Sequence, residues 1–167
     1  MYANKASKTS GLALTVLVLV AGVFPAHAPA QETDAQPLGI VVHPDTDIDN
    51  LTLDELRRIF LADRLYWPDN SRIVLLVRAP TAYERTFVLN HIYQMTEEEF
   101  RRYWVAKMFR AEIASGPRVV FSSNMALGLV TAIPGSISFM LASEIPADAK
   151  VVRIDGKLPS EEGYPLQ

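Results

Sequence analysis

The chain has 167 residues, with 16 basic and 19 acidic side chains, a net charge of −3 at pH 7 and no cysteine. This acidic balance argues against a nucleic-acid-binding protein, which needs a basic surface. Without cysteine the chain has neither disulfides nor the N-terminal cysteine through which a lipoprotein is anchored.

The first thirty residues have the pattern of a secretory signal peptide. Two lysines precede an apolar run from Leu12 to Phe24, and small residues follow it. The run is too short to cross a bilayer comfortably, since a spanning helix needs about 20 apolar residues. Cleavage after Ala28 would place Pro29 just beyond the scissile bond, so we expect cleavage after Ala30 and a periplasmic protein.

Removal of this segment leaves enough chain for one domain with a hydrophobic core and too little for two ordinary domains. Its polar start, residues 31–37, is expected to be a flexible leader. The domain is then expected to occupy residues 38–167.

The first half of this domain reads as strand, helix, turn and strand. Leu38 to Val42 is a short apolar run, typical of a buried strand. Residues 50–60 carry apolar side chains at helical spacing, and Thr52-x-x-Glu55 is a capping box. Residues 67–71 are turn-forming, and the continuous apolar run Ile73 to Val77 predicts a strand buried on both faces.

The second half continues the alternation. Helical spacing resumes at Thr81, and Thr96-x-x-Glu99 opens a further helix. That helix carries an aromatic stripe, for which core packing is favoured over a ligand-binding role, with Trp104 in the core. The remaining elements expected are a strand at 118–121, a helix at 123–133, and strands at 136–140 and 150–154. Alternating strands and helices predict an α/β fold with a largely parallel sheet.

Residue constellations for catalysis or metal binding are missing from the sequence. Beyond the signal segment there are two histidines, His43 and His91, and no H-E-x-x-H, G-x-S-x-G, Walker or G-x-G-x-x-G pattern. We therefore expect no catalytic residue, metal ion or cofactor. His43 follows the first strand, at an end where α/β sheets usually bind ligands, but a lone surface histidine is the favoured interpretation.

The best candidate for binding lies where the second long strand ends. Arg78 sits at its carboxyl end, and a helix follows whose free amides form a potential anion site. A guanidinium can hold an oxyanion through two parallel hydrogen bonds. The alternative, equally weighted, is that Thr81-x-x-Glu84 is a capping box and that Arg78 pairs with Glu84 or an aspartate.

Several linked motifs resemble the substrate-binding proteins of phosphate ABC transporters. Residues 60–78 resemble the family pattern "IF-L-G … W-P-D-G … I-V-x-V-x-R", residues 134–139 resemble "p-G-a-I-g-Y", and residues 163–166 resemble the terminal "Y-P-L". The resemblance extends from Leu38 to Leu166. It implies a single lobe of a type 2 periplasmic-binding-protein-like fold, with a mixed, mostly parallel sheet flanked by helices. Full-length members have two lobes that close over phosphate.

The phosphate-binding motif itself departs from the family pattern. In two-lobed members a Ser-Gly-Thr segment follows the arginine that Arg78 matches, and here Ala82, Tyr83 and Glu84 take those places. Two like charges about 4 Å apart repel by roughly 4 kcal/mol at an effective dielectric of 20, so Glu84 argues against tight phosphate binding. Glycines of the family are also replaced, by Ala62, Asn70 and Ser138.

A different and weaker anion site remains available at this end of the sheet. The resemblance and the two helix starts together nominate five contacts, namely Arg78, Thr81, Arg85, Ser122 and Ser123. For the two serines a plain helix-capping role is the favoured interpretation.

Three classes of function follow from this sequence. The favoured one is a periplasmic solute-binding protein that holds phosphate or another small oxyanion without chemistry and delivers it to an ABC transporter permease. The alternative is a ligand-free interaction module that docks to an envelope protein or to a second copy of itself. An enzyme is least favoured, because no nucleophile, base or metal cluster is present.

Overall fold

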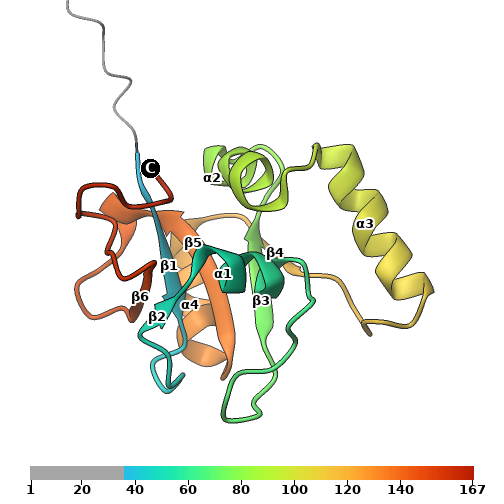
Figure 1. Cartoon of the computed structure of the whole chain (residues 1–167), viewed down its shortest axis with the longest axis horizontal. Helices are drawn as coiled ribbons and strands as arrows, with labels where there is room; N and C mark the ends of the chain where they lie inside the picture. Colours follow the sequence, from blue (N-terminus) through green and yellow to red (C-terminus); the bar gives the residue numbers. More distant parts are fainter. Residues whose placement is uncertain (1–35) are drawn as a thin grey trace, which may run out of the picture. The chain divides into compact units, whose positions relative to one another are not determined.

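The computed structural model describes residues 36–167. The predicted signal peptide, its predicted cleavage site and most of the expected leader lie outside the described residues. Six strands form one sheet (Figure 1), with the bounds β1 Leu38–Val42, β2 Asn50–Leu51, β3 Val74–Arg78, β4 Arg118–Val120, β5 Ser136–Leu141 and β6 Val151–Ile154. The helices are α1 Leu53–Phe60, α2 Tyr83–Val88, the π-helix η1 Leu89–Tyr93, α3 Glu97–Phe109, α4 Ser123–Ala132 and the 3₁₀ turn η2 Ala142–Glu144.

The sheet is mostly parallel, and the strand order is β2-β6-β1-β5-β3-β4. The pairs β2–β6, β5–β3 and β3–β4 are parallel, whereas β1 is antiparallel to both of its neighbours, β6 and β5. Five strands therefore point one way and β1 points the other. The predicted fold class, a mixed and mostly parallel sheet flanked by helices, is confirmed.

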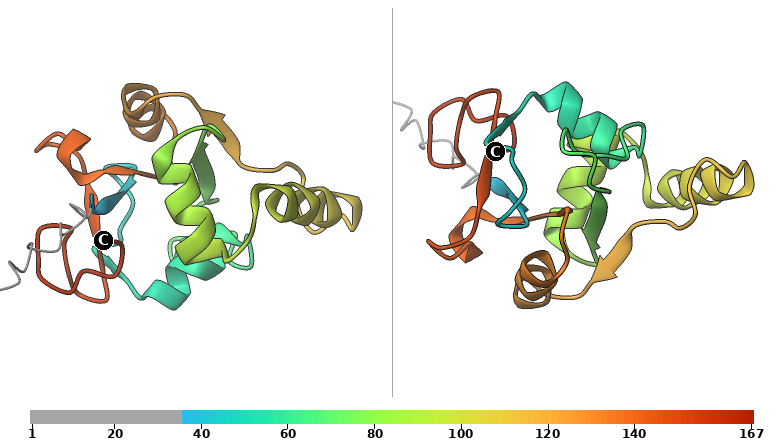
Figure 2. Two further views of the ribbon diagram at one scale, coloured as in Figure 1. Left: turned by 90° about the horizontal axis from the view of Figure 1, so that it is seen from above. Right: turned by 90° about the horizontal axis from the view of Figure 1, so that it is seen from below.

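Helices cover both faces of this sheet, which explains its continuous apolar strands. On one face Ile40, Val77 and Phe139 pack with α1, α2, η1 and the C-terminal segment. On the other face Val41 and Leu76 pack with α4. Figure 2 shows α4 on one side of the sheet and α1 and α2 on the other.

Both predicted capping boxes are present. Thr52 accepts from the Glu55 amide and Glu55 accepts from the Thr52 amide, and Thr96 and Glu99 do the same at the start of α3. These hydrogen bonds from the threonine backbone and hydroxyl lower the pKa of both glutamates.

Two sequence predictions were wrong in detail. The helix expected over 50–60 begins at Leu53, because Asn50 and Leu51 instead form the short strand β2 beside Arg153 and Ile154. The aromatic stripe of α3 is buried at Phe100 and Trp104, as predicted for Trp104, but Met108 is 40% exposed. This helix projects away from the sheet (Figures 1 and 2), so its far end has no core to pack against.

Two of the positions where the chain lacks a family glycine have left-handed backbone. Ala62 has φ 52° and Asn70 has φ 66°. Asparagine adopts this conformation with little cost, but an alanine there is strained by about 1–2 kcal/mol. Ala111, on the loop after α3, has the same conformation with φ 55°.

We expect Ala62→Gly and Ala111→Gly each to raise the free energy of unfolding by about 0.5–1 kcal/mol, because the relief of strain exceeds the added entropy of an unfolded glycine. Denaturant titration measures the change. Ala106→Gly, in the middle of α3, is the control and should lower stability by about 1 kcal/mol. A loss of stability in all three variants would contradict the strain argument.

Candidate functional site

The predicted site lies at the carboxyl edge of the sheet, where β3 and β4 end. Arg78, the last residue of β3, pairs in register with Val120, the last residue of β4. Ser122 and Ser123 follow β4 directly and begin α4. Parallel pairing therefore brings Arg78 and the two serines to the same edge, as the sequence predicted.

Arg78 is held by an internal carboxylate. Its Nε donates to Glu84 Oε1 at 3.1 Å, and the two side chains are 10% and 6% exposed. Of the two interpretations left open by the sequence, the pairing of Arg78 with Glu84 is the one observed. The Nη1 atom of Arg78 is buried and has no hydrogen-bond partner among the described residues.

The turn between β3 and α2 differs from the capping box considered above. Helix α2 begins at Tyr83, its N-cap is Ala82, and no side chain caps it. Thr81 is exposed in the turn, so its hydroxyl faces solvent rather than the helix amides. The capping box does not form because the N-cap is Ala82, one residue after Thr81, and because the Glu84 carboxylate accepts a hydrogen bond from Arg78 instead.

Arg85 is buried and fully engaged. Its Nε and Nη2 donate to the two carboxylate oxygens of Glu97, both at 3.0 Å, and its Nη1 donates to the Arg78 carbonyl at 3.2 Å. The guanidinium also lies over the Phe100 ring, 4.1 Å from its centroid. All three nitrogens are thus committed within the protein, and Arg85 fixes the backbone at Arg78.

The serines at the start of α4 play two different parts. Ser122 is the N-cap, and its hydroxyl accepts from the Met125 amide at 3.1 Å. The Ser123 hydroxyl donates to the Glu144 carboxylate of η2. The Ser123 hydroxyl at this helix start is therefore already hydrogen-bonded to a carboxylate of the same chain.

Donor groups at this edge of the sheet are paired with carboxylates of the same chain. Glu84, Glu97 and Glu144 bind Arg78, Arg85 and Ser123 respectively. These are the same kinds of contact that an oxyanion would make with guanidinium and hydroxyl donors. The Arg78 Nη1 is the donor left over.

His43 lies at the opposite edge of the sheet. Because β1 runs against the other strands, its last residue pairs with Ile137 near the start of β5, and the His43 amide donates to the Ser136 carbonyl. The prediction that His43 lies at the ligand-binding edge of the sheet was therefore wrong. The His43 side chain is also mostly buried, at 10% exposed, rather than a surface group, and its Nδ1 accepts from the Asp45 amide.

Exposed apolar side chains beside the site were missed by the sequence analysis. Val119, Phe121 and Met125 are 43%, 74% and 41% exposed around the start of α4. Trp67, Tyr66 and Tyr83 do not form a second patch, because Trp67 is 3% exposed and the two tyrosines lie before and after β3. The sequence signal for this patch was Phe121, an apolar residue directly before two serines. It lies beyond the end of β4, so the strand does not bury it.

Neither metal-binding nor membrane-spanning features occur in residues 36–167. No group of three or more histidine and acidic side chains there could hold a metal ion. No helix in that range is long and apolar enough to cross a bilayer.

Comparison with solved structures identifies the fold. An ABC-type phosphate transport receptor from Vibrio cholerae superposes with a TM-score of 0.63 at 18% identity, over 78% of this chain and 52% of that one. PstS from Borrelia burgdorferi gives 0.61 at 16% identity, over 78% and 53%. A putative phosphate ABC transporter substrate-binding protein with bound phosphate from Clostridium perfringens gives 0.60 at 16%, over 74% and 46%.

The chain has the fold of a phosphate-type substrate-binding protein. It spans about half the length of these structures, consistent with the single lobe inferred from the sequence motifs. No family model and no curated protein matches the chain. The neighbours are named as binding proteins, not enzymes.

The buried Arg78–Glu84 pair should show strong energetic coupling. Arg78→Met and Glu84→Leu each leave an unpaired buried charge and should lower the free energy of unfolding by about 3–5 kcal/mol, whereas the double variant should lose much less than the sum. Denaturant titration of all four proteins measures the coupling.

The control is the exposed pair Arg102–Glu98, whose side chains are 69% and 73% exposed. Its coupling should be under about 1 kcal/mol. Additive losses at Arg78 and Glu84 would mean that the two residues act independently.

Proposed function

We propose that this protein is a periplasmic solute-binding protein that holds phosphate or a similar small oxyanion at the carboxyl edge of its sheet. The observation that carries the proposal is the buried, unpartnered Nη1 of Arg78 beside the start of α4. In this arrangement Arg78 is the principal contact, and Thr81, Ser122 and Ser123 supply hydroxyl and amide donors. Arg85 positions the Arg78 backbone through its carbonyl.

The bound carboxylates limit the affinity of this site. An incoming anion competes with Glu84 for Arg78 and with Glu144 for Ser123. Repulsion between Glu84 and the ligand acts against binding at the same time. The proposed binding is therefore weak for the isolated domain, without covalent chemistry and without a cofactor.

The proposed setting is transport across the cell envelope. A cleaved signal peptide would release the domain into the periplasm, where an ABC transporter permease would receive its solute. The similarity to phosphate transport receptors supports this setting through the fold. Since those chains are about twice as long, a second copy or another envelope protein would supply the opposing surface.

Isothermal titration with phosphate and sulfate at fixed ionic strength tests the binding proposal. We expect weak, saturable phosphate binding, lost in Arg78→Met and strengthened at least about tenfold in Glu84→Gln, which removes the competing charge and keeps the side-chain volume. Circular dichroism establishes that each variant is folded.

Glu98→Gln is the control, because Glu98 is exposed on α3 and pairs only with Arg102. It should leave the affinity unchanged. If phosphate produces no saturable heat with the wild type or with Glu84→Gln, the solute-binding function is wrong.

The second candidate is an interaction module, and one observation favours it. The apolar side chains Val119, Phe121 and Met125 lie exposed beside the candidate site. Apolar groups gathered on a surface are typical of protein contacts. A second copy of the chain, meeting this surface with its own, is the partner proposed.

Sedimentation at increasing concentration distinguishes this candidate. The wild type should dimerise, and Phe121→Ser should remain monomeric because it removes the most exposed of the three side chains. Phe109→Ser is the matched control: Phe109 is 92% exposed at the end of α3, away from this surface. Equal dimerisation of all three proteins would place the interface elsewhere.

A further inference from the structure

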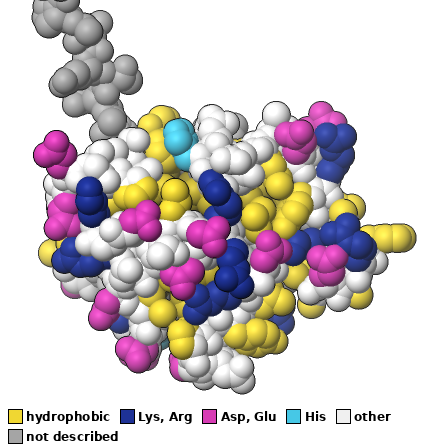
Figure 3. Space-filling model, in the orientation of Figure 1, with side chains coloured by type: hydrophobic (Ala, Val, Ile, Leu, Met, Phe, Trp, Pro, Cys, Tyr) yellow, Lys and Arg dark blue, Asp and Glu magenta, His cyan; other side chains and the backbone are white. Residues whose placement is uncertain are grey.

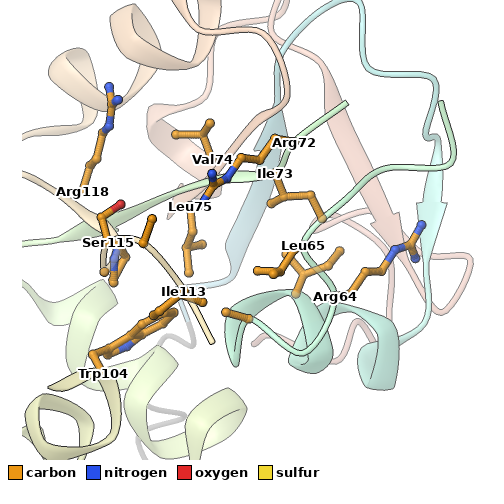
Figure 4. A pocket seen from close by; sticks show the side chains of 15 residues that line it. Arg64, Leu65, Arg72, Ile73, Val74, Leu75, Trp104, Ile113, Ser115 and Arg118 are labelled. Carbon is orange, nitrogen blue, oxygen red and sulfur yellow. The ribbon is translucent and has the colours of Figure 1, made fainter. Parts of the chain in front are cut away.

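A cavity of about 260 Å³ lies at the edge of the sheet opposite to Arg78. Its walls come from four segments: the loop after α1, the start of β3, the middle of α3, and the loop 110–117 that leads into β4. Figure 4 shows Leu65, Leu75, Trp104 and Ile113 facing one another across it. None of the five residues proposed for the oxyanion site lines it.

The cavity is apolar inside and basic at its rim. Its polar side chains are Arg64, Arg72, Ser115 and Arg118, and no acidic side chain lines it. Arg64 is already used, because its Nε donates to the Tyr66 carbonyl and its Nη1 lies 3.6 Å from Glu55. In Figure 4 it points away from the other lining residues.

Arg72 and Arg118, unlike Arg64, are not used within the described part of the protein. Within residues 36–167 neither guanidinium has a hydrogen bond or an ion pair, and both residues are exposed. Figure 4 shows Arg72 reaching over the space beside Leu75, whereas Arg118 stands on the Ser115 side with its guanidinium turned outward. Positive charge without a counter-charge thus borders an apolar interior.

We propose that this cavity binds a small carboxylate with an apolar body. The apolar body would lie among Leu65, Leu75 and Ile113, and the carboxylate would pair with Arg72 at the rim. A guanidinium prefers a carboxylate because two parallel hydrogen bonds can form. The unbalanced charge excludes cations, and the apolar lining disfavours a bare inorganic anion.

Size restricts the ligand further. Cavities that hold drug-sized molecules measure roughly 300–1,000 Å³, so a volume of about 260 Å³ suits a single ring or a short acyl chain. Benzoate, phenylacetate and hexanoate represent this class. The site is independent of the oxyanion site, since it uses other residues at the other edge of the sheet.

Isothermal titration with these three carboxylates tests the proposal, with benzamide and inorganic phosphate as comparison ligands. We expect saturable binding of at least one carboxylate and at least about tenfold weaker binding of benzamide than of benzoate. Arg72→Gln should weaken the carboxylate at least about tenfold. Ala114→Phe, which fills the cavity from its exposed loop, should abolish binding.

Arg101→Gln is the matched control: it removes one exposed arginine from α3, outside this cavity, and should change nothing. An excess of phosphate should leave carboxylate binding intact, which separates this site from the oxyanion site. The proposal is overturned if none of the carboxylates binds, if benzamide binds as well as benzoate, or if Arg72→Gln has no effect.

Discussion

The buried guanidinium of Arg85 joins three parts of the fold. Arg85 belongs to α2. Its guanidinium donates to the Arg78 carbonyl at the end of β3 and to both carboxylate oxygens of Glu97 in the first turn of α3. Its position over Phe100 adds contact with the same helix. Since a buried charge is stable only when it is well paired, the geometry around the Arg85 guanidinium is narrowly fixed. The orientation of Arg78 and the attachment of α3 both follow from it.

Helix α3 is held by the buried side chains of Phe100 and Trp104 and by a set of polar contacts. Beyond the Arg85 junction, the Tyr103 hydroxyl donates to the Leu61 carbonyl at 2.7 Å, and Lys107 Nζ lies 2.7 Å from Asp63. Apart from Phe100 and Trp104, its apolar side chains contribute little burial. The helix therefore stands out from the sheet, and Figure 3 shows hydrophobic side chains exposed on that side of the molecule. The cavity lies where Trp104 of α3 and the loop 110–117 face the start of β3 without filling the space between.

The sequence predicted the elements and the layer architecture well because their signals are local. Continuous apolar runs such as Ile73 to Val77 report burial on both faces, and the two capping boxes report helix starts. The reversed direction of β1 could not be predicted, since strand direction is decided by pairing with residues about a hundred positions away, such as Ile137. Because of this reversal, His43 lies at the edge opposite to the one predicted for it.

The sequence predicted where the candidate site lies, but it did not predict that carboxylates of the same chain would pair with its donors. The order of strands and helices was enough to bring Arg78 near Ser122 and Ser123. The sequence raised Glu84 as a partner for Arg78, but it gave no sign that Glu144 would reach Ser123 from a different turn. Side-chain pairing between loops depends on their exact paths, which local patterns do not encode. The cavity escaped notice for the same reason, because its arginines are forty-six positions apart in sequence.

The reversed β1 also decides where the chain enters the domain. Leu38 pairs with Leu141 at the end of β5 and donates its amide to the Leu166 carbonyl. Pro37 and Leu166 therefore both lie at the edge that carries Arg78. A surface or tag attached at Pro37 or Leu166 would stand beside the oxyanion site and leave the carboxylate cavity open at the opposite edge, so a binding experiment on such a protein reaches the cavity more readily.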